Sequence, residues 1–180
     1  MTLRPNLRKF VRTAHVIFTV GWLGTVVAFL ALAIVGLNNQ DTQIVRAVYV
    51  AMDLIARYVI VPLSLLPLLL TGPLLSLGTP WGLFRHYWIL VKLVINILST
   101  LILLVHMQPI SYLARVAAEG TLSSTDRSVQ IQLVVAAGAG LLALLVATGL
   151  AVYKPRGMTP YGWRKQYEER TGSPTDDAET

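Results

Sequence analysis

Four long apolar runs limit what this chain can fold into more than any other feature of its sequence. A helix needs roughly 20 apolar residues to cross a hydrocarbon layer of about 30 Å. The runs that meet this requirement cover residues 14–37, 54–77, 83–106 and 129–153. The sequence therefore predicts an all-α fold in which four transmembrane helices form one bundle.

The composition explains why lipid rather than water is expected around these runs. Of the 180 residues, 54% are apolar and 13% are charged, whereas soluble domains carry roughly 25% charged residues. A soluble domain of this length would need more polar surface than the chain supplies. The chain has no cysteine, which excludes disulfides, thiolate metal sites, iron–sulfur clusters and cysteine nucleophiles.

The first apolar run follows a basic segment that holds Arg4, Arg8, Lys9 and Arg12. A basic start before an apolar run is also typical of a signal peptide. The apolar part of a signal peptide, however, has only about 7–15 residues. Because this run is clearly longer, we expect it to be an uncleaved first span.

Prolines shape the second and third runs. Pro62, Pro67 and Pro73 interrupt the second run, and a proline kinks a helix because it lacks a backbone donor. Neighbouring helices compensate for such kinks inside a membrane, so we expect one bent span that begins near Thr42. Pro109 predicts an end or a kink of the third span.

The basic residues predict the orientation of the bundle. Cytoplasmic loops carry an excess of Lys and Arg. In a four-span arrangement ten of these residues fall on one side and three on the other. The ten are Arg4, Arg8, Lys9, Arg12, Arg85, Lys154, Arg156, Arg164, Lys165 and Arg170, and the three are Arg46, Arg115 and Arg127. We therefore expect both termini in the cytoplasm, and the short connections favour an up-down-up-down bundle.

Residues 1–157 are expected to form the transmembrane domain, and residues 158–180 a polar cytoplasmic tail that is partly disordered. The basic residues lie at the two ends of the chain rather than on one face, which argues against a nucleic-acid partner. The expected partner of the apolar surface is the lipid bilayer. A homo-oligomer or a larger membrane complex is the further assembly to consider.

Polar residues inside the runs are the most informative candidates, because each is costly in hydrocarbon. Several recur every seven residues, which is close to two helical turns, so they should share one face of their helix. In the third run these are Arg85, Lys92, Ser99 and His106, with Asn96 one turn after Lys92, and in the second run they are Arg57, Ser64 and Thr71. Such stripes should face the bundle interior, where they form either interhelical hydrogen bonds or a polar pathway.

The histidines suggest a cofactor or metal site. His15 opens the first span and His86 the third, at similar depth near the cytoplasmic interface. Two neutral imidazoles at matched depth could bind one haem b iron or one metal ion. His106 lies about 30 Å along the helix from His86 and nearer to Asp53, so His106 and Asp53 form a second candidate metal pair. The alternative for each histidine is an ordinary hydrogen bond. Asp53 is also an i,i+4 partner of Arg57, a pairing expected to be structural.

Two segments carry a family resemblance. The stretch HVIFTVGWLG at residues 15–24 resembles the opening of the copper-resistance protein D membrane domain and of small uncharacterised four-helix membrane proteins of bacteria. In these families a histidine early in a helix precedes a Trp-x-Gly element. The stretch LGTPWGLFRHYWILVKL at residues 77–93 is similar to a recurring segment of such bacterial proteins. The resemblance implies the bacterial cytoplasmic membrane and makes His15 and His86 the residues of interest, with copper or haem as their ligand.

Enzyme motifs are missing: the sequence has no GxSxG elbow, P-loop, HExxH or GxGxxG motif. Three functions therefore stay open. The first is a structural or accessory component of the membrane. The second is a histidine-dependent haem or metal binder, for example in electron transfer. The third is a small transporter or channel that uses the polar stripes as an oligomer.

Overall fold

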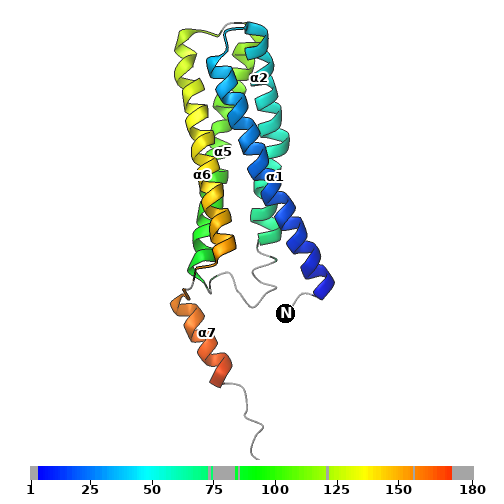
Figure 1. The fold of residues 1–180 in the computed structure, drawn as a ribbon, viewed down its shortest axis with the longest axis vertical. Coiled ribbons are helices and arrows are strands. Elements are labelled where there is room, and N and C mark those ends of the chain that lie inside the picture. Colours follow the sequence, from blue (N-terminus) through cyan, green and yellow to red (C-terminus); the bar gives the residue numbers. More distant parts are fainter. Residues whose placement is uncertain are drawn as a thin grey trace, which may run out of the picture.

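The computed structural model describes residues 4–72, 74, 84, 86–120, 122–155 and 157–171. All regular structure in these ranges is helical, apart from one isolated antiparallel bridge between His86 and Met158. Four long helical segments lie side by side, and a shorter helix, α7, extends from one end of the bundle (Figure 1). The predicted all-α fold with four long apolar helices is therefore confirmed.

The first long helix, α1, spans Pro5–Asn38 and is longer than the predicted first span of 14–37. Proline suits the first turn, because its missing N–H would have no intrahelical partner there. After a short extended turn the chain enters α2, Thr42–Ile55. Asp41 begins α2, since its carboxylate accepts two backbone N–H groups of the first turn.

The second apolar run stays helical through its prolines by forming two π turns. After α2 the chain passes through η1, α3 and η2, with bounds Ala56–Ile60, Val61–Leu66 and Pro67–Thr71. The N–H group that follows each π segment donates to the carbonyl five residues back. These wider turns accommodate Pro62 and Pro67, which remove backbone donors. Pro73, the third predicted interruption, lies outside the described residues.

The third long helix, α5, spans Tyr87–Glu119 and continues well beyond the predicted span of 83–106. Pro109 lies inside the helix instead of ending it. The helix ends at Gly120, whose φ of 70° is the left-handed conformation that glycine adopts without steric cost. With 33 residues at 1.5 Å each, α5 is about 50 Å long, so it exceeds the thickness of a hydrocarbon layer.

The fourth long helix, α6, spans Arg127–Tyr153 and follows a short 3-10 turn, η3, Ser124–Asp126. Ser123 and Asp126 form a reciprocal capping box before it. The Asp126 carboxylate accepts the Ser123 N–H at 2.9 Å and the Ser123 hydroxyl at 3.1 Å. These bonds start the helical segment at Ser124 and α6 at Arg127, before the predicted position 129.

The shorter helix α7, Pro160–Thr171, was not predicted from the sequence, which indicated only a polar tail from residue 158. The chain before it contacts the start of α5. The Thr159 hydroxyl donates to the Phe84 carbonyl at 2.5 Å and accepts the Gly162 N–H at 3.1 Å. Residues 172–180, where most of the disorder was expected, lie outside the described part of the chain.

The four long segments form a closed ring. α1 packs on α2 and α6, and α5 packs on the same two helices. The large buried side chains at the centre come from all four and include Trp22, Phe29, Tyr49, Met52, Leu113 and Leu133. Each helix therefore contributes to one shared apolar core.

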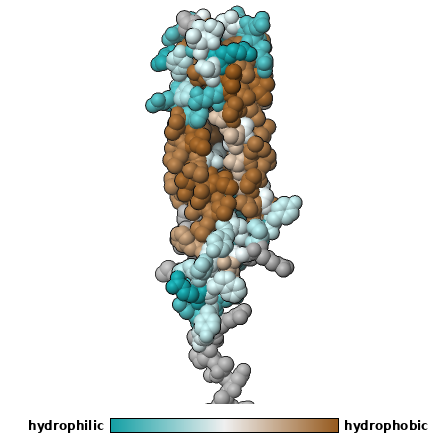
Figure 2. All heavy atoms as spheres, turned by 90° about the vertical axis from the view of Figure 1, so that its left-hand side faces the viewer, coloured by the Kyte–Doolittle hydropathy of each residue, from teal (hydrophilic) through white to brown (hydrophobic). Residues whose placement is uncertain are grey.

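The outside of the ring is also apolar. All four long segments are long and apolar enough to cross a membrane. On the face drawn in Figure 2 the outward side chains form a broad brown band with hydrophilic residues above and below it. In its most apolar stretch α5 has only 6% of its residues buried, the smallest share of the four. Most apolar side chains of α5 therefore point away from the core.

Candidate functional site

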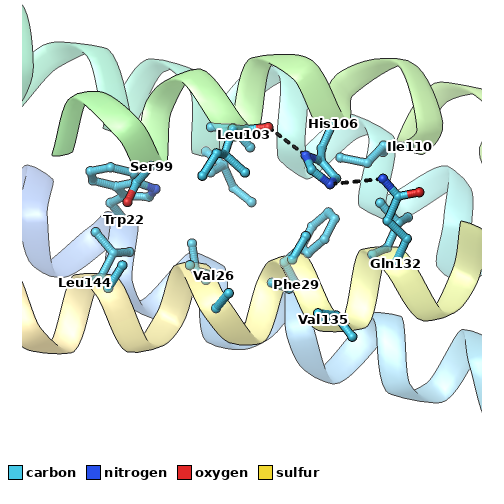
Figure 3. Close-up of a pocket in the computed structure, with 18 of the residues that line it drawn as sticks. Trp22, Val26, Phe29, Ser99, Leu103, His106, Ile110, Gln132, Val135 and Leu144 are labelled. Carbon is cyan, nitrogen blue, oxygen red and sulfur yellow. Dashed lines mark hydrogen bonds between the residues drawn. The ribbon is translucent and has the colours of Figure 1, made fainter. Parts of the chain in front are cut away.

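A groove with a volume of about 610 Å³ lies between α1, α5 and α6. Its lining is almost wholly apolar and includes Trp22, Val26, Phe29, Leu103, Ile110, Val135 and Leu144 (Figure 3). Figure 2, which faces α5 and α6, shows a pale recess within the brown band. The groove therefore opens sideways, through the apolar surface of the bundle.

Small residues on α6 create this space. Ala136, Ala139, Gly140 and Ala143 all line the groove, where larger side chains would fill it. A Cβ atom added to Gly140 would meet no other atom within 4 Å. The facing residues of α5 and α1 therefore do not close over this part of α6.

His106 supplies the main polar group of the groove. Its Nδ1 lies 2.8 Å from the Ile102 carbonyl of the preceding turn, and its Nε2 lies 3.4 Å from Nε2 of Gln132 on α6 (Figure 3). A carbonyl can only accept, so Nδ1 carries the proton and Nε2 accepts the Gln132 amide N–H. This arrangement fits a neutral imidazole and leaves the Gln132 carbonyl oxygen and one amide N–H for other partners.

The predicted stripe of α5 reaches the groove in two places. Ser99 lies near one end of the groove and His106 near the other (Figure 3). Seven residues of helix separate them, or about 10 Å. Lys92 and Asn96 are half-buried closer to the start of α5 and do not line the groove.

Arg57 and Ser64, from the stripe predicted on the second run, do not line the groove. Ser64 is fully buried, but its hydroxyl donates to the Val61 carbonyl of its own helix at 2.8 Å. Arg57 belongs to a separate polar network on the other side of α5. The side chain of Thr71 and the whole of Arg85 lie outside the described residues.

The two histidines predicted to share a cofactor lie on α1 and at the start of α5. His15 is half-buried on α1, where the charge of Lys92 on α5 acts on it. Lys92 lies about 9 Å along the helix from His86. His86 is the N-cap residue of α5 and forms the isolated β-bridge with Met158. The centre of its ring lies 6.3 Å from that of the Trp88 ring, and the two rings are tilted relative to each other. His86 therefore helps to join the segment before α7 to the start of α5.

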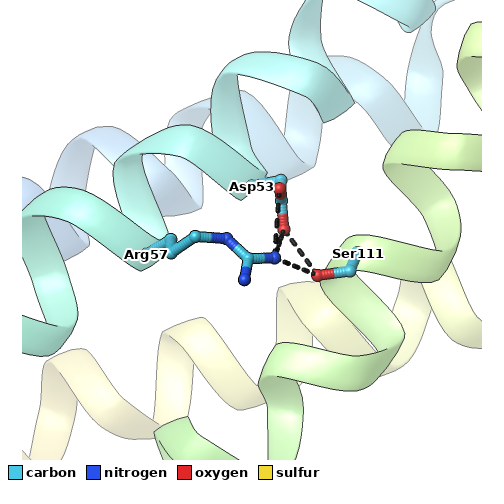
Figure 4. A network of polar contacts seen from close by, with 3 residues as sticks. All are labelled: Asp53, Arg57 and Ser111. Carbon is cyan, nitrogen blue, oxygen red and sulfur yellow. Dashed lines mark hydrogen bonds and ion pairs between the residues drawn. The ribbon is translucent and has the colours of Figure 1, made fainter.

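The second predicted pair, His106 and Asp53, also has separate partners. The Asp53 carboxylate forms an ion pair with Arg57 at 3.2 Å and accepts the Ser111 hydroxyl at 2.6 Å (Figure 4). The Arg57 guanidinium donates to Ser111 at 2.9 Å, which closes a three-membered network between the second segment and α5. His106 instead faces α6. In the described ranges no three or more His, Cys, Asp or Glu side chains gather closely enough to hold a metal ion.

Sequence reasoning missed Gln132, Trp22 and Phe29 as groove residues. Gln132 carried a signal, because it is a polar residue inside an apolar run of membrane-spanning length. The two aromatic residues carried none, since an aromatic side chain on a membrane helix faces lipid or a core equally well.

Comparisons of the chain with protein-family models, with curated proteins and with solved structures found no match.

Proposed function

We propose that this chain is an integral membrane protein that crosses a bacterial cytoplasmic membrane four times, in alternating directions, with both termini in the cytoplasm. Four helical segments of sufficient length and apolar character support the four crossings. The excess of Lys and Arg in the segments assigned to the side of the termini supports the orientation. A reporter fused to the C-terminus tests it, and activity of a periplasm-dependent reporter there would contradict it.

Within the membrane the protein acts as an accessory component that binds a lipid-soluble molecule in the groove between α1, α5 and α6. The groove itself carries this proposal. Its volume of about 610 Å³ lies in the range of roughly 300–1,000 Å³ that small-molecule sites occupy. Its nearly apolar lining with a few convergent polar groups is also the usual character of such sites.

The polar groups indicate which kind of molecule fits. His106 and Gln132 lie together near one end of the groove, and the lining between them and Ser99 is apolar. A polar group brought into apolar surroundings costs free energy unless it forms a hydrogen bond. The ligand is therefore an elongated apolar molecule with a hydroxyl or carbonyl head that bonds to the Gln132 amide group.

The sideways opening supports entry from the lipid. A ligand that reaches the groove through the apolar band stays in hydrocarbon and never has to cross the polar ends of the bundle (Figure 2). Haem fits less well, because axial ligation needs a free imidazole nitrogen and both ring nitrogens of His106 have partners. A Soret band that disappears in both His15→Ala and His86→Ala would instead support haem held by those two histidines.

Filling the groove tests the proposal. Gly140→Leu places a large side chain in the empty space, whereas Gly138→Leu places the same side chain two residues away, outside the groove lining. Organic extracts of the purified proteins are compared by mass spectrometry. The wild type and Gly138→Leu should retain the same apolar compound, and Gly140→Leu should lose it. An equal extract from all three folded proteins would contradict ligand binding in the groove.

A further inference from the structure

A second hollow, of about 370 Å³, lies on a different side of α5 and brings two arginines together. Arg57 lines it from η1 and Arg115 from α5. The remaining lining residues are Met107, Gln108, Ser111 and Tyr112, all on α5. This hollow shares no lining residue with the groove between α1, α5 and α6.

One of the two arginines that line the hollow forms no ion pair with a carboxylate of the described residues. Asp53 forms an ion pair with Arg57, and this is the one ion pair recorded among the described residues. Arg115 is exposed and has no such carboxylate partner in that part of the chain. The nearby Asp126 carboxylate is held by the backbone and hydroxyl of Ser123 and by the Tyr112 hydroxyl, at 2.8–3.1 Å. The Asp126 carboxylate is thus turned to Ser123 and Tyr112, and the Arg115 guanidinium is available to an anion that enters the hollow.

One of the two arginines is already held in place. The Asp53 carboxylate and the Ser111 hydroxyl both accept from the same terminal nitrogen, Nη2, of Arg57 (Figure 4). The guanidinium has five N–H donors in a rigid fork, so donors remain after these bonds. A guanidinium fixed in this way binds a phosphate with a smaller loss of side-chain entropy.

We infer that this hollow binds the phosphodiester headgroup of a membrane phospholipid. A phosphodiester carries a negative charge and two free oxygens, which can accept hydrogen bonds from the two arginines. Gln108 lines the same hollow, and its amide group adds a polar contact for the rest of the headgroup.

The position of the hollow favours a lipid over a free phosphate. Ser111 lies eight residues before the end of α5, about 12 Å along the helix. Because α5 is longer than a hydrocarbon layer is thick, this level corresponds to the headgroup region. Leu104 and Ile97 follow at intervals of seven residues toward the middle of α5, on the face of Ser111, and both are exposed. They offer an apolar track for an acyl chain below the headgroup.

Lipid binding by single-charge variants tests the inference. Arg115→Gln removes one arginine of the hollow, and Arg46→Gln removes an exposed arginine of α2 that does not line it. Both proteins are purified in detergent, checked for helix content, and titrated with phosphatidylglycerol under native mass spectrometry. Arg115→Gln should weaken binding about tenfold, the effect of one charge-assisted hydrogen bond. Arg46→Gln should bind like the wild type.

Two further titrations distinguish a lipid headgroup from free phosphate as the ligand. A monoacylated phosphatidylglycerol of the same headgroup should still bind, and inorganic phosphate at the same concentration should not compete with the lipid. Equal weakening in Arg46→Gln and Arg115→Gln would overturn the inference, because it would indicate general surface charge. Full competition by inorganic phosphate would also overturn it, because the site would then recognise the anion without its lipid.

Discussion

The ring of Tyr49 on α2 lies directly against Gly36 on α1. A Cβ atom at position 36 would lie 2.8 Å from the ring carbon Cζ and 2.9 Å from the hydroxyl oxygen. Tyr49 is only 1% exposed, so its ring has no free space to move into. The close approach of α1 and α2 near their connecting turn therefore depends on the absence of a side chain at Gly36.

Gly36→Ala should destabilise the protein, because the new methyl group would push the Tyr49 ring out of its packed position. We expect a loss of about 1–3 kcal/mol, typical of overpacking a close-packed core. Unfolding by a denaturing detergent, followed by circular dichroism, measures it. Gly24→Ala is the matched control on the same helix, since a Cβ there meets nothing within 4 Å. Equal stabilities of the two variants would contradict the packing described here.

Tyr49→Phe should leave the stability unchanged or raise it slightly. The Tyr49 hydroxyl is buried and has no hydrogen-bond partner in the described part of the protein. A buried polar group without a partner costs about 1–3 kcal/mol, so removing it offsets the loss of any weak contact. The same detergent unfolding measures the effect. A clear destabilisation would show that the hydroxyl has a partner, such as an ordered water.

Asp126→Ala should weaken the start of α6 and its link to α5. The carboxylate caps the helix through Ser123 and also accepts the Tyr112 hydroxyl of α5 at 2.8 Å. Loss of a cap costs about 1 kcal/mol and loss of a hydrogen bond to a charged group about 1.5–3 kcal/mol. Glu119→Ala removes an exposed carboxylate at the end of α5 that precedes this cap. It should change the stability by less than about 0.5 kcal/mol. If both variants unfold alike, the capping network contributes nothing.

Thr159→Val should release α7 from the start of α5. Its hydroxyl both donates to the Phe84 carbonyl and accepts the Gly162 N–H, and valine keeps the shape without these bonds. Trypsin cleavage at Arg164 and Lys165 in α7 should become about fivefold faster, which corresponds to about 1 kcal/mol for a lost cap.

Thr171→Val provides the control for that experiment, because the bonds of the Thr171 hydroxyl to described residues all lie within α7. Its cleavage rate should match that of the wild type. Unchanged cleavage of Thr159→Val would mean that other contacts hold α7 in place.

His106→Leu should weaken the binding of ligands with a polar head and leave the binding of plain hydrocarbons unchanged. Gln132 loses the partner that orients its amide group, so a ligand with a hydroxyl or carbonyl head should bind up to about tenfold more weakly. A plain hydrocarbon of the same length should bind as well as before. Competition between the two ligands on the purified protein measures the ratio. Equal losses for both would contradict a hydrogen-bonding role of His106.

The helices could be predicted from hydropathy, and so could the last residues of α1 and α6, but the start of α1 and the end of α5 could not. Hydropathy reports which residues tolerate lipid, whereas a helix ends where a cap or a backbone conformation allows it. α5 therefore passes through Pro109 and stops at Gly120, beyond the apolar run. α7 escaped prediction for the same reason, because a polar helix without apolar periodicity has no hydropathy pattern.

The candidate site could be predicted only along single helices. The spacing of seven residues correctly placed Ser99 and His106 on one face of α5, since that relation follows from helix geometry alone. The pairing of His15 with His86 stays a prediction, because it depends on how two helices face each other and on their relative height, which no spacing within one helix contains.

The amino-acid sequence by itself determined that this chain forms four long apolar helices, because the free energy of lipid contact depends on the composition of each run separately. Only the tertiary structure decided that Gln132 faces His106 and that Arg57 and Arg115 share a hollow. Those relations depend on how each helix is rotated about its axis, and rotation results from the sum of many packing contacts such as that of Tyr49 with Gly36.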